Sequence, residues 1–192
     1  MKSGNIPGTL FPIREMDGAT GLAFLDKVFY VTTGIMLTQI RNITGIDGTT
    51  LQNWVKRGWV PGPKGKSYSR EHLARILLIN MMRDTMQLSR VMYLLCYING
   101  TEPEDRVIAE SDLYDYVCRV TAKVSDTLAE GMDALDGAID EVLADYDEPA
   151  AGAKRRVAAG IRIIVLTYCA GMIKAMADDT VDELGADKKR KR

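Results

Sequence analysis

The apolar positions of residues 36–98 predict short helices separated by turns. A first helix is marked by apolar residues at helical spacing: Leu37, Ile40 and Ile43. A second is marked in the same way: Leu51, Trp54 and Val55. Gly45 separates the two helices, and Ile46 fills the turn. A hydroxyl from Thr49 or Thr50 is expected to cap the second helix. A short helix, a glycine-bearing turn and a second helix form the pattern of a helix-turn-helix.

A segment rich in proline and glycine follows the second helix. Gly58 ends that helix, and residues 59–61 leave it as an extended exit. Residues 61–66 read PGPKGK, which predicts a loop because proline and glycine disfavour both helix and sheet. Ser69 then caps a third helix, with Glu71 in its first turn. A loop of this kind beside a helix-turn-helix is a wing.

These segments follow one another in a fixed order: Gly45-Ile46, Thr49–Trp54, Gly58–Pro61, Lys64–Tyr68 and Ser69–Leu73. In this order residues 40–98 resemble the winged helix of the MerR-type transcriptional regulators. More narrowly, the whole chain is similar to an uncharacterised bacterial family of unknown function built on this module. The resemblance implies an all-α fold, in which a MerR-like winged helix-turn-helix precedes a helical bundle domain, and it implies binding to double-stranded DNA.

The chain departs from the MerR-type pattern at residues that the family uses for contact. The two arginines of the family's second helix are replaced here by Thr49 and Gln52. In the wing, Gly65 stands in place of a tyrosine and Lys66 in place of an arginine. The scaffold of the module is therefore kept, while part of its basic surface is lost. This loss leaves open an alternative, in which the winged helix is a protein-interaction module without specific DNA binding.

The resemblance implies DNA contacts on the second helix, the wing and the start of the third helix: Thr49, Thr50, Gln52, Asn53, Lys56, Arg57, Lys64, Lys66 and Arg70. Thr50 and the helix N-terminus suit a phosphate. Gln52 and Asn53 carry amides that can pair with adenine in the major groove. The two wing lysines and Arg70 suit backbone phosphates. The aromatic residues of the module are expected to pack in its core and wing hinge: Trp54, Trp59 and Tyr68.

The polar and apolar pattern divides the chain into four parts. Residues 1–19 show no periodicity and predict a flexible arm. Residues 20–100 hold the winged helix and an extra leading helix over 21–32, which we expect to cover the back of the third and fourth helices. Residues 101–186 predict an acidic helical domain for dimerisation or effector sensing. Residues 187–192 form a basic tail, either a solvated end or a non-specific phosphate tether.

Helical periodicity runs through the second domain. One apolar stripe joins six residues: Val124, Leu128, Met132, Leu135, Ile139 and Val142. Asp126 and Glu130 lie off this stripe. The last helix, residues 153 to about 178, is apolar nearly all round at its centre, but Arg162 and Lys174 leave too short an uncharged run for a membrane span.

The charges of the last helix oppose its dipole. Its first turn is basic, with Lys154, Arg155 and Arg156, and its end is acidic, with Asp178, Asp179 and Glu183. An antiparallel neighbour would relieve this arrangement. Two neighbours remain open: the preceding helix of the same chain, or a second copy in a homodimer that buries some of Ile164, Leu166, Tyr168 and Ile173.

Charge is distributed unevenly between the two domains. The formal net charge is −1, yet residues 36–98 hold nine Lys and Arg against three Asp and Glu. Residues 101–148 hold three Lys and Arg against fifteen Asp and Glu. This asymmetry is expected if only the first domain contacts a polyanion such as DNA.

The sequence offers little support for catalysis, and we expect neither enzyme activity nor a cofactor. His72 is the only histidine and lies in a first helical turn, which favours a surface or partner contact over general-base chemistry. Asp133, Asp136 and Asp140 have the spacing of a solvated helix face, so no metal site is expected. The three widely spaced cysteines are typical of free thiols in a reducing cytoplasm. No apolar leader follows the basic start, which also predicts a cytoplasmic protein.

Overall fold

The computed structural model describes residues 4–124 and 132–190, and for residues 103, 132 and 183–190 it describes the backbone alone. Over this part of the chain there are eight α-helices and two short 3-10 helices, with isolated bridges in place of β-strands. The elements are η1 (Ile13–Met16), α1 (Gly21–Val28), α2 (Leu37–Thr44), α3 (Gly48–Lys56), α4 (Arg70–Met82), α5 (Leu88–Asn99), η2 (Pro103–Asp105), α6 (Glu110–Val124), α7 (Met132–Val142) and α8 (Ala153–Arg190). The all-α prediction is confirmed for the described residues.

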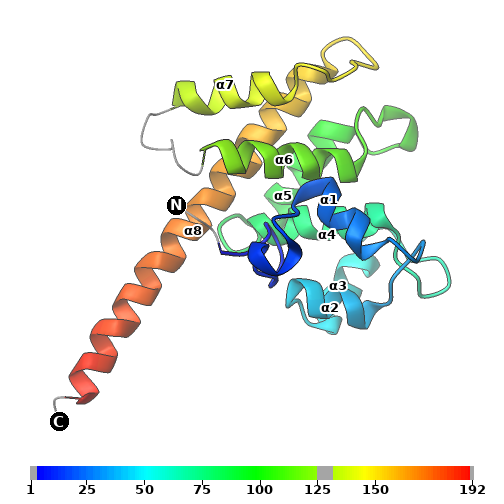
Figure 1. Cartoon of the computed structure of the whole chain (residues 1–192). Helices are drawn as coiled ribbons and strands as arrows, with labels where there is room; N and C mark the ends of the chain where they lie inside the picture. The colour runs from blue at the N-terminus through cyan, green and yellow to red at the C-terminus, as the bar shows by residue number, and fades with distance from the viewer. Residues whose placement is uncertain (1–3, 125–131, 191–192) are drawn as a thin grey trace.

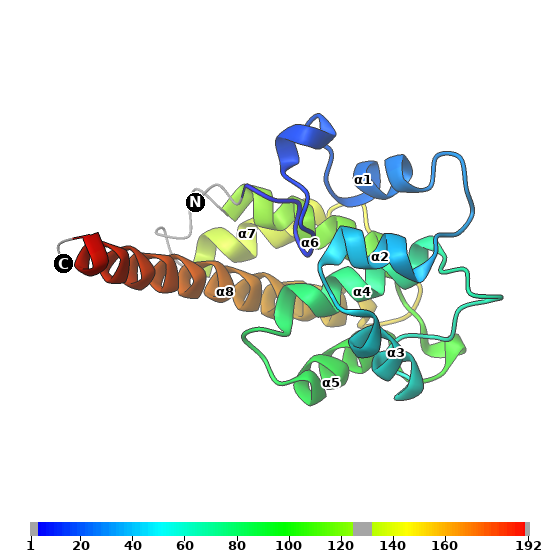
Figure 2. The same cartoon turned by 90° about the horizontal axis from the view of Figure 1, so that it is seen from below.

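Helix α4 lies in the middle of the molecule and is covered on several sides. It packs against α2, α5, α6 and α8 (Figure 2). Eight of its thirteen residues are buried: Leu73, Ala74, Ile76, Leu77, Leu78, Ile79, Met81 and Met82. A helix with apolar residues on several sides is stable in water only when its neighbours cover those sides.

Helix α1 packs against α6, and not against the back of α4 and α5 as predicted (Figure 1). Asp115 of α6 provides the reason, because its carboxylate accepts a hydrogen bond of 2.9 Å from the backbone N–H of Leu22. The Thr20 side chain at the N-cap position makes no such bond, so a residue of another helix caps α1. Gly21 allows the close approach, since its φ is +55° and an added Cβ would lie 2.2 Å from the Asp115 carboxylate.

Residues 4–19, expected to belong to a flexible arm, are packed onto the helices. Ile6 is fully buried in the hydrophobic core. The Tyr114 hydroxyl donates a 2.8 Å hydrogen bond to the carbonyl of Pro7. A few apolar side chains and long-range hydrogen bonds to the backbone hold this segment, which explains why it lacks helical periodicity. The first three residues of the predicted arm lie outside the described part of the chain.

Helix α6 is joined to the first module, so the predicted domain boundary at residue 100 does not separate two cores. One hydrophobic cluster runs from Ile6 through α4 and α6 to α8. The carboxylate of Glu71, in the first turn of α4, caps the start of α6. It accepts hydrogen bonds from the backbone N–H of Glu110 at 2.8 Å and from the Ser111 hydroxyl at 2.6 Å. A polar contact between the two predicted domains therefore fixes where α6 begins.

Glu71 is also the charged centre of this junction. The Arg106 guanidinium donates to Oε2 of Glu71 at 2.6 Å, the oxygen that also accepts from the Glu110 N–H. Burial is the largest single effect on the pKa of Glu71 and raises it. The Ser111 hydroxyl, the Arg106 charge and the backbone N–H groups of Ser111 and Glu110 together outweigh burial, so the pKa lies below its ordinary value of 4.5. The carboxylate is therefore ionised at neutral pH.

The predicted apolar stripe of the second domain is present where the structure describes it. Val124 ends α6 in a buried position, and Leu135, Ile139 and Val142 of α7 are buried. Leu128, Asp126, Glu130 and the side chain of Met132 lie outside the described residues.

Helix α8 begins in the core and then leaves the body of the protein (Figure 1). Val157, Ile161, Ile164 and Val165 are buried, with α8 packing on α4, α5, α6 and α7. Arg162 pairs with Asp136 of α7 at 3.2 Å, so α8 does have a neighbour within its own chain, as one of the two open alternatives predicted. The helix continues beyond the predicted end near residue 178.

By length and composition, the segment Ala153–Asp182 could cross a membrane. Core helices of proteins without membrane spans meet the same criterion. In this segment, 33% of the most apolar stretch of 18 residues is buried inside the protein. The buried face in the first half of α8 has the character of a core helix.

Replacing Glu71 with glutamine should destabilise the junction between α4 and α6. The amide keeps the shape but lowers the strength of the hydrogen bonds and of the contact with Arg106, so we expect a loss of about 1–2 kcal/mol at pH 7. Because the folded pKa is lowered, the carboxylate contributes its full stabilisation above 4.5 and loses it as the pH falls through the lower folded value. Urea unfolding from pH 7 down to pH 3 should therefore show the two proteins converging in acid. A pH-independent difference, or an equal loss in the exposed control Glu102→Gln, would contradict this role.

Candidate nucleic-acid interface

The turn between α2 and α3 is set by local residues. Gly45 has a φ of +72°, and its N–H donates to the Arg41 carbonyl at 2.8 Å, which closes α2. Ile46 is buried, so the turn is fixed in the core. The predicted order of helix, turn and helix is present at residues 37–56.

Helix α3 turns one face to the core and the other to solvent. Leu51 and Trp54 are buried. The opposite face carries four of the predicted contact residues, all exposed: Thr49, Gln52, Asn53 and Lys56. Because Leu51 and Trp54 anchor the helix, these side chains are presented on a rigid element.

The N-terminus of α3 is capped by Asp47, and not by Thr49 or Thr50 as predicted. The Asp47 carboxylate accepts from the Thr50 backbone N–H at 2.8 Å and from the Thr50 hydroxyl at 2.5 Å. These bonds, the hydroxyl first, hold the pKa of Asp47 below its ordinary value of 3.8. An ionised carboxylate therefore occupies the position that the sequence assigned to a phosphate, and Thr50 is committed to it.

The wing ends in a tight hairpin. The N–H of Ser67 donates to the carbonyl of Lys64 at 2.9 Å. The two residues between them have positive φ angles, +56° at Gly65 and +70° at Lys66, as a two-residue hairpin turn of type I′ requires. Lys64 and Lys66 are exposed at the tip. The turn thus exposes two cations to solvent. It also holds Lys66 in a left-handed backbone conformation, which is strained for a residue other than glycine.

The base of the wing is fastened to the residues before α2. Tyr68 and Ile35 exchange two backbone hydrogen bonds, at 2.8 and 2.9 Å. Tyr68 and Trp54 are buried and Trp59 is half-buried, as the packing interpretation predicts. Arg57 lies over the Trp59 ring, with its guanidinium carbon 5.0 Å from the ring centre.

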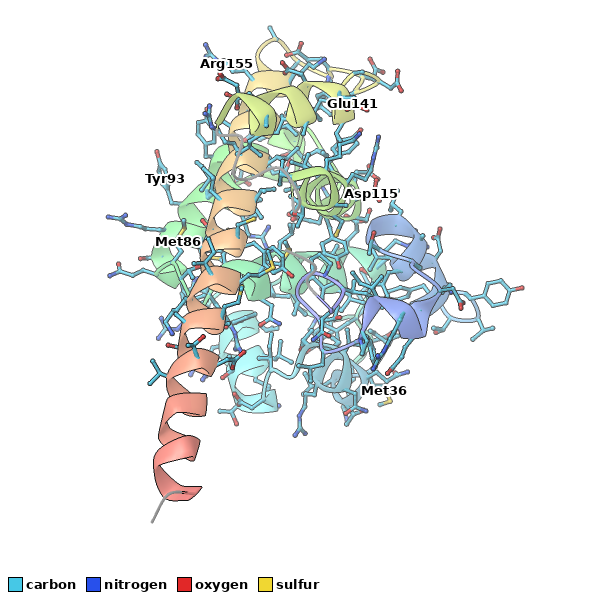
Figure 3. The ribbon with its side chains drawn as sticks, turned by 60° about the vertical axis from the view of Figure 1, so that its left-hand side comes forward. Met36, Met86, Tyr93, Asp115, Glu141 and Arg155 are labelled. Carbon is cyan, nitrogen blue, oxygen red and sulfur yellow. The ribbon has the colours of Figure 1, made fainter. Side chains whose placement is uncertain are left out.

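A small hollow brings α3 and the wing together. Its volume is about 280 Å³, and it is lined by Met36, Leu37, Thr38, Gln52, Pro63, Lys66 and Tyr68. Gln52 and Lys66, predicted on separate elements, therefore lie on one surface. Met36 is largely exposed at the start of α2 (Figure 3).

Arg70 is partly committed to another contact. Its guanidinium pairs with Asp26 of α1 at 2.5 Å, which ties α1 to the start of α4. Because its guanidinium already has a carboxylate partner, Arg70 suits a phosphate less well than the wing lysines. Arg41, which the sequence analysis did not select, is exposed on α2 and lies near the start of α3, since an added Cβ at Gly48 would be 3.5 Å from its side chain.

His72 is half-buried and caps α4, while the surface or partner contact that the sequence suggested for it stays a prediction. Its Nδ1 accepts from the Ser69 backbone N–H at 3.1 Å and lies 2.6 Å from the Ser69 hydroxyl. It borders a hollow of about 540 Å³ between α4, α5 and the start of α6. Two of the charged groups on its wall already serve the fold, because Arg75 pairs with Glu110 at 2.7 Å.

Thiols and metal-binding groups add no further chemistry to this surface. Cys118 and Cys169 are buried and Cys96 is half-buried, all as free thiols. Burial raises the pKa of the Cys118 thiol to about 12. Among the residues that the structure describes, no three His, Cys, Asp or Glu side chains are grouped so as to hold a metal ion.

Comparison with known proteins identifies a family for this chain. The sequence pattern of a protein family described as "Domain of unknown function (DUF1836)" matches residues 22–117, half of the 192-residue chain. The comparisons with curated proteins and with solved structures gave no match. The matched region runs from α1 into α6 and crosses the predicted boundary at residue 100, in agreement with the shared core.

Substitutions at Asp47 should separate its capping role from its charge. Asp47→Ala removes the acceptor for the Thr50 N–H and should lower the midpoint of thermal unfolding. Asp47→Asn keeps an acceptor at the same place and should retain most of the midpoint. Equal midpoints for the alanine variant and the unmodified protein would show that this cap does not stabilise α3.

Proposed function

This chain belongs to the DUF1836 family, and we propose that it is a DNA-binding transcriptional regulator with a MerR-like winged helix. In this proposal α3 enters the major groove of double-stranded DNA and the wing contacts phosphates alongside. Such a regulator would work in the cytoplasm as a homodimer, because a single winged helix reads only a few base pairs.

The outward face of α3 is the observation that carries the proposal. Gln52, Asn53 and Lys56 are exposed on the side opposite Leu51 and Trp54. A major groove admits an α-helix, and amide side chains on its outer face can pair with adenine. Gln52 and Asn53 are therefore assigned to base reading, with Thr49 beside them.

The basic residues are assigned to phosphates. Lys56 and Arg57 lie at the C-terminal end of α3, and Lys64 and Lys66 at the tip of the wing. These four residues are exposed, and cations of this kind supply the sequence-independent part of DNA affinity. Arg70 and Thr50, which have partners in the fold, are assigned a supporting role.

Asp47 limits how DNA can approach. Its negative charge at the start of α3 opposes a phosphate at that point. The phosphates are therefore expected beside the C-terminal end of α3 and the wing.

A second candidate function, protein interaction, is supported by apolar side chains near the wing. Tyr30 and Val31 are 87% and 88% exposed, and Met36 is 58% exposed. Gly34, which stands between Val31 and Met36, lies against Ser67, where an added Cβ would be 2.0 Å from the hydroxyl oxygen. Exposed apolar residues beside a winged helix suit a protein partner. Salt-dependent retention on duplex DNA distinguishes this function from the first.

Removing the two wing charges should weaken binding to every duplex. Lys64→Gln with Lys66→Asn neutralises the tip, and asparagine tolerates the left-handed backbone of position 66. If both lysines contact phosphates, the slope of log affinity against log salt for random duplex should fall by about 0.9 for each lost contact. Fluorescence anisotropy across a salt series measures this slope.

Gln52→Ala is the matched control for that measurement. It removes a predicted base contact without changing charge, so the salt slope on random duplex should stay the same. An unchanged slope in the lysine variant would show that the wing is not at the DNA. Absence of salt-dependent binding by the unmodified protein would overturn the proposal and favour protein interaction.

A further inference from the structure

Helix α8 has two apolar faces, and only one of them is covered. The covered face packs on the body of the protein and includes Val157, Ile161, Ile164 and Val165. The opposite face carries a second apolar row: Ala159, Ile163, Leu166, Ala170, Ile173 and Ala177. Of this row, Ala159 and Leu166 are half-buried and the other four are exposed. We call these six residues the outer row.

The spacing of the outer row is that of a coiled coil. Its members alternate at intervals of four and three residues, which places them at the a and d positions of a heptad repeat. Ile164, which the sequence offered as a dimer contact, is fully buried in its own chain and is not available. The outer row therefore replaces it as the candidate contact surface.

We propose that the outer row pairs with the outer row of a second copy of this chain, antiparallel and about a two-fold axis. The spacing permits one register in which every member finds a partner. Ile163 lies opposite Ile173 of the second copy, and Leu166 lies opposite Ala170. Ala159 lies opposite Ala177, and the same three pairs recur beyond the axis. Each layer joins an a position to a d position, as antiparallel coiled coils require.

Charge selects the antiparallel orientation. The first turn of α8 carries Lys154, Arg155 and Arg156, and the projecting half carries Asp178, Asp179 and Asp182. In the proposed register, residues 154–156 lie level with residues 180–182 of the second copy. Opposite charges then lie close together, and each cluster also faces a helix end that suits its sign. Parallel pairing would set basic beside basic and acidic beside acidic.

The projecting half of α8 is explained by the same register. Ile173 is 55% exposed because no part of its own chain covers it in the described structure. Tyr93 on α5, which is 75% exposed, lies beside α8 and would border the partner helix (Figure 3). A membrane is the other apolar environment, but a span would require Val157 and Ile161 to leave the core.

The dimer would serve to bind DNA only if the proposed function is correct, so this part of the inference rests on that function. A two-fold dimer presents two α3 helices to two half-sites. The association itself is measured without DNA. A monomer that still binds duplex with a salt-dependent affinity would overturn the dimer and leave DNA binding standing.

Association is tested by light scattering on the full chain at low micromolar concentration. The unmodified protein should have about twice the chain mass of 21.2 kDa. Ile163→Glu with Ile173→Glu should be monomeric with unchanged helical circular dichroism, because both side chains lie outside the core. Ala175→Glu is the matched control: it adds a charge to the projecting half away from the outer row and should remain dimeric. A monomeric unmodified protein, or equal dissociation in the control, would overturn the proposal.

Cysteine cross-linking tests the register. In a Cys96→Ser background, Ile163→Cys combined with Ile173→Cys should give a disulfide-linked dimer on mild oxidation, while each single variant should not. Cross-linking by Ile163→Cys alone would indicate parallel pairing and contradict the register. Binding of the unmodified monomer to lipid vesicles, abolished in Ile163→Glu with Ile173→Glu, would overturn the dimer in favour of a membrane surface.

Discussion

The burial of α4 on several sides is the constraint on which the rest of the structure depends. Its apolar residues, such as Leu73, Leu77 and Ile79, are fully buried. The helix is stable only when α2, α5, α6 and α8 assemble around it together. This requirement joins the first module to the C-terminal helices, and Glu71 adds a polar contact at the same place by capping α6. The position of α3 and the wing at the surface follows from this shared core.

The candidate surface combines residues that favour DNA with others that restrict it. Lys56, Lys64 and Lys66 supply exposed cations, and Gln52 lies on the same surface as Lys66. Asp47 acts in the opposite direction, since the helix start needs its carboxylate as a cap. A surface of this kind should bind through its wing and the end of α3. It differs in this respect from a helix whose N-terminus holds a phosphate.

Sequence reasoning predicted the features that depend on neighbouring residues. Gly45 and Gly65 set the two turns through their own backbone conformations, and the apolar spacing of residues 37–56 fixed two helices. It failed where distant residues decide the structure. Asp115 positions α1 by a hydrogen bond to Leu22, a residue 93 positions earlier in the chain. The hydrogen bond from Tyr114 to Pro7 holds the N-terminal segment, which has no helical periodicity. The Asp47 cap could have been predicted from neighbouring residues, because aspartate caps a helix as well as threonine does and Asp47 stands three residues before Thr50.

The central claim is that α3 and the wing form the DNA contact, and amide hydrogen exchange with a random-sequence duplex at low salt tests it most directly. The account predicts slower exchange on adding DNA at residues 47–57 and 64–67. It predicts little change in α7, which lies on the far side of α4 and α6 (Figure 1). Binding accompanied by protection elsewhere and none in these two segments would contradict the account, as would unchanged exchange throughout the chain.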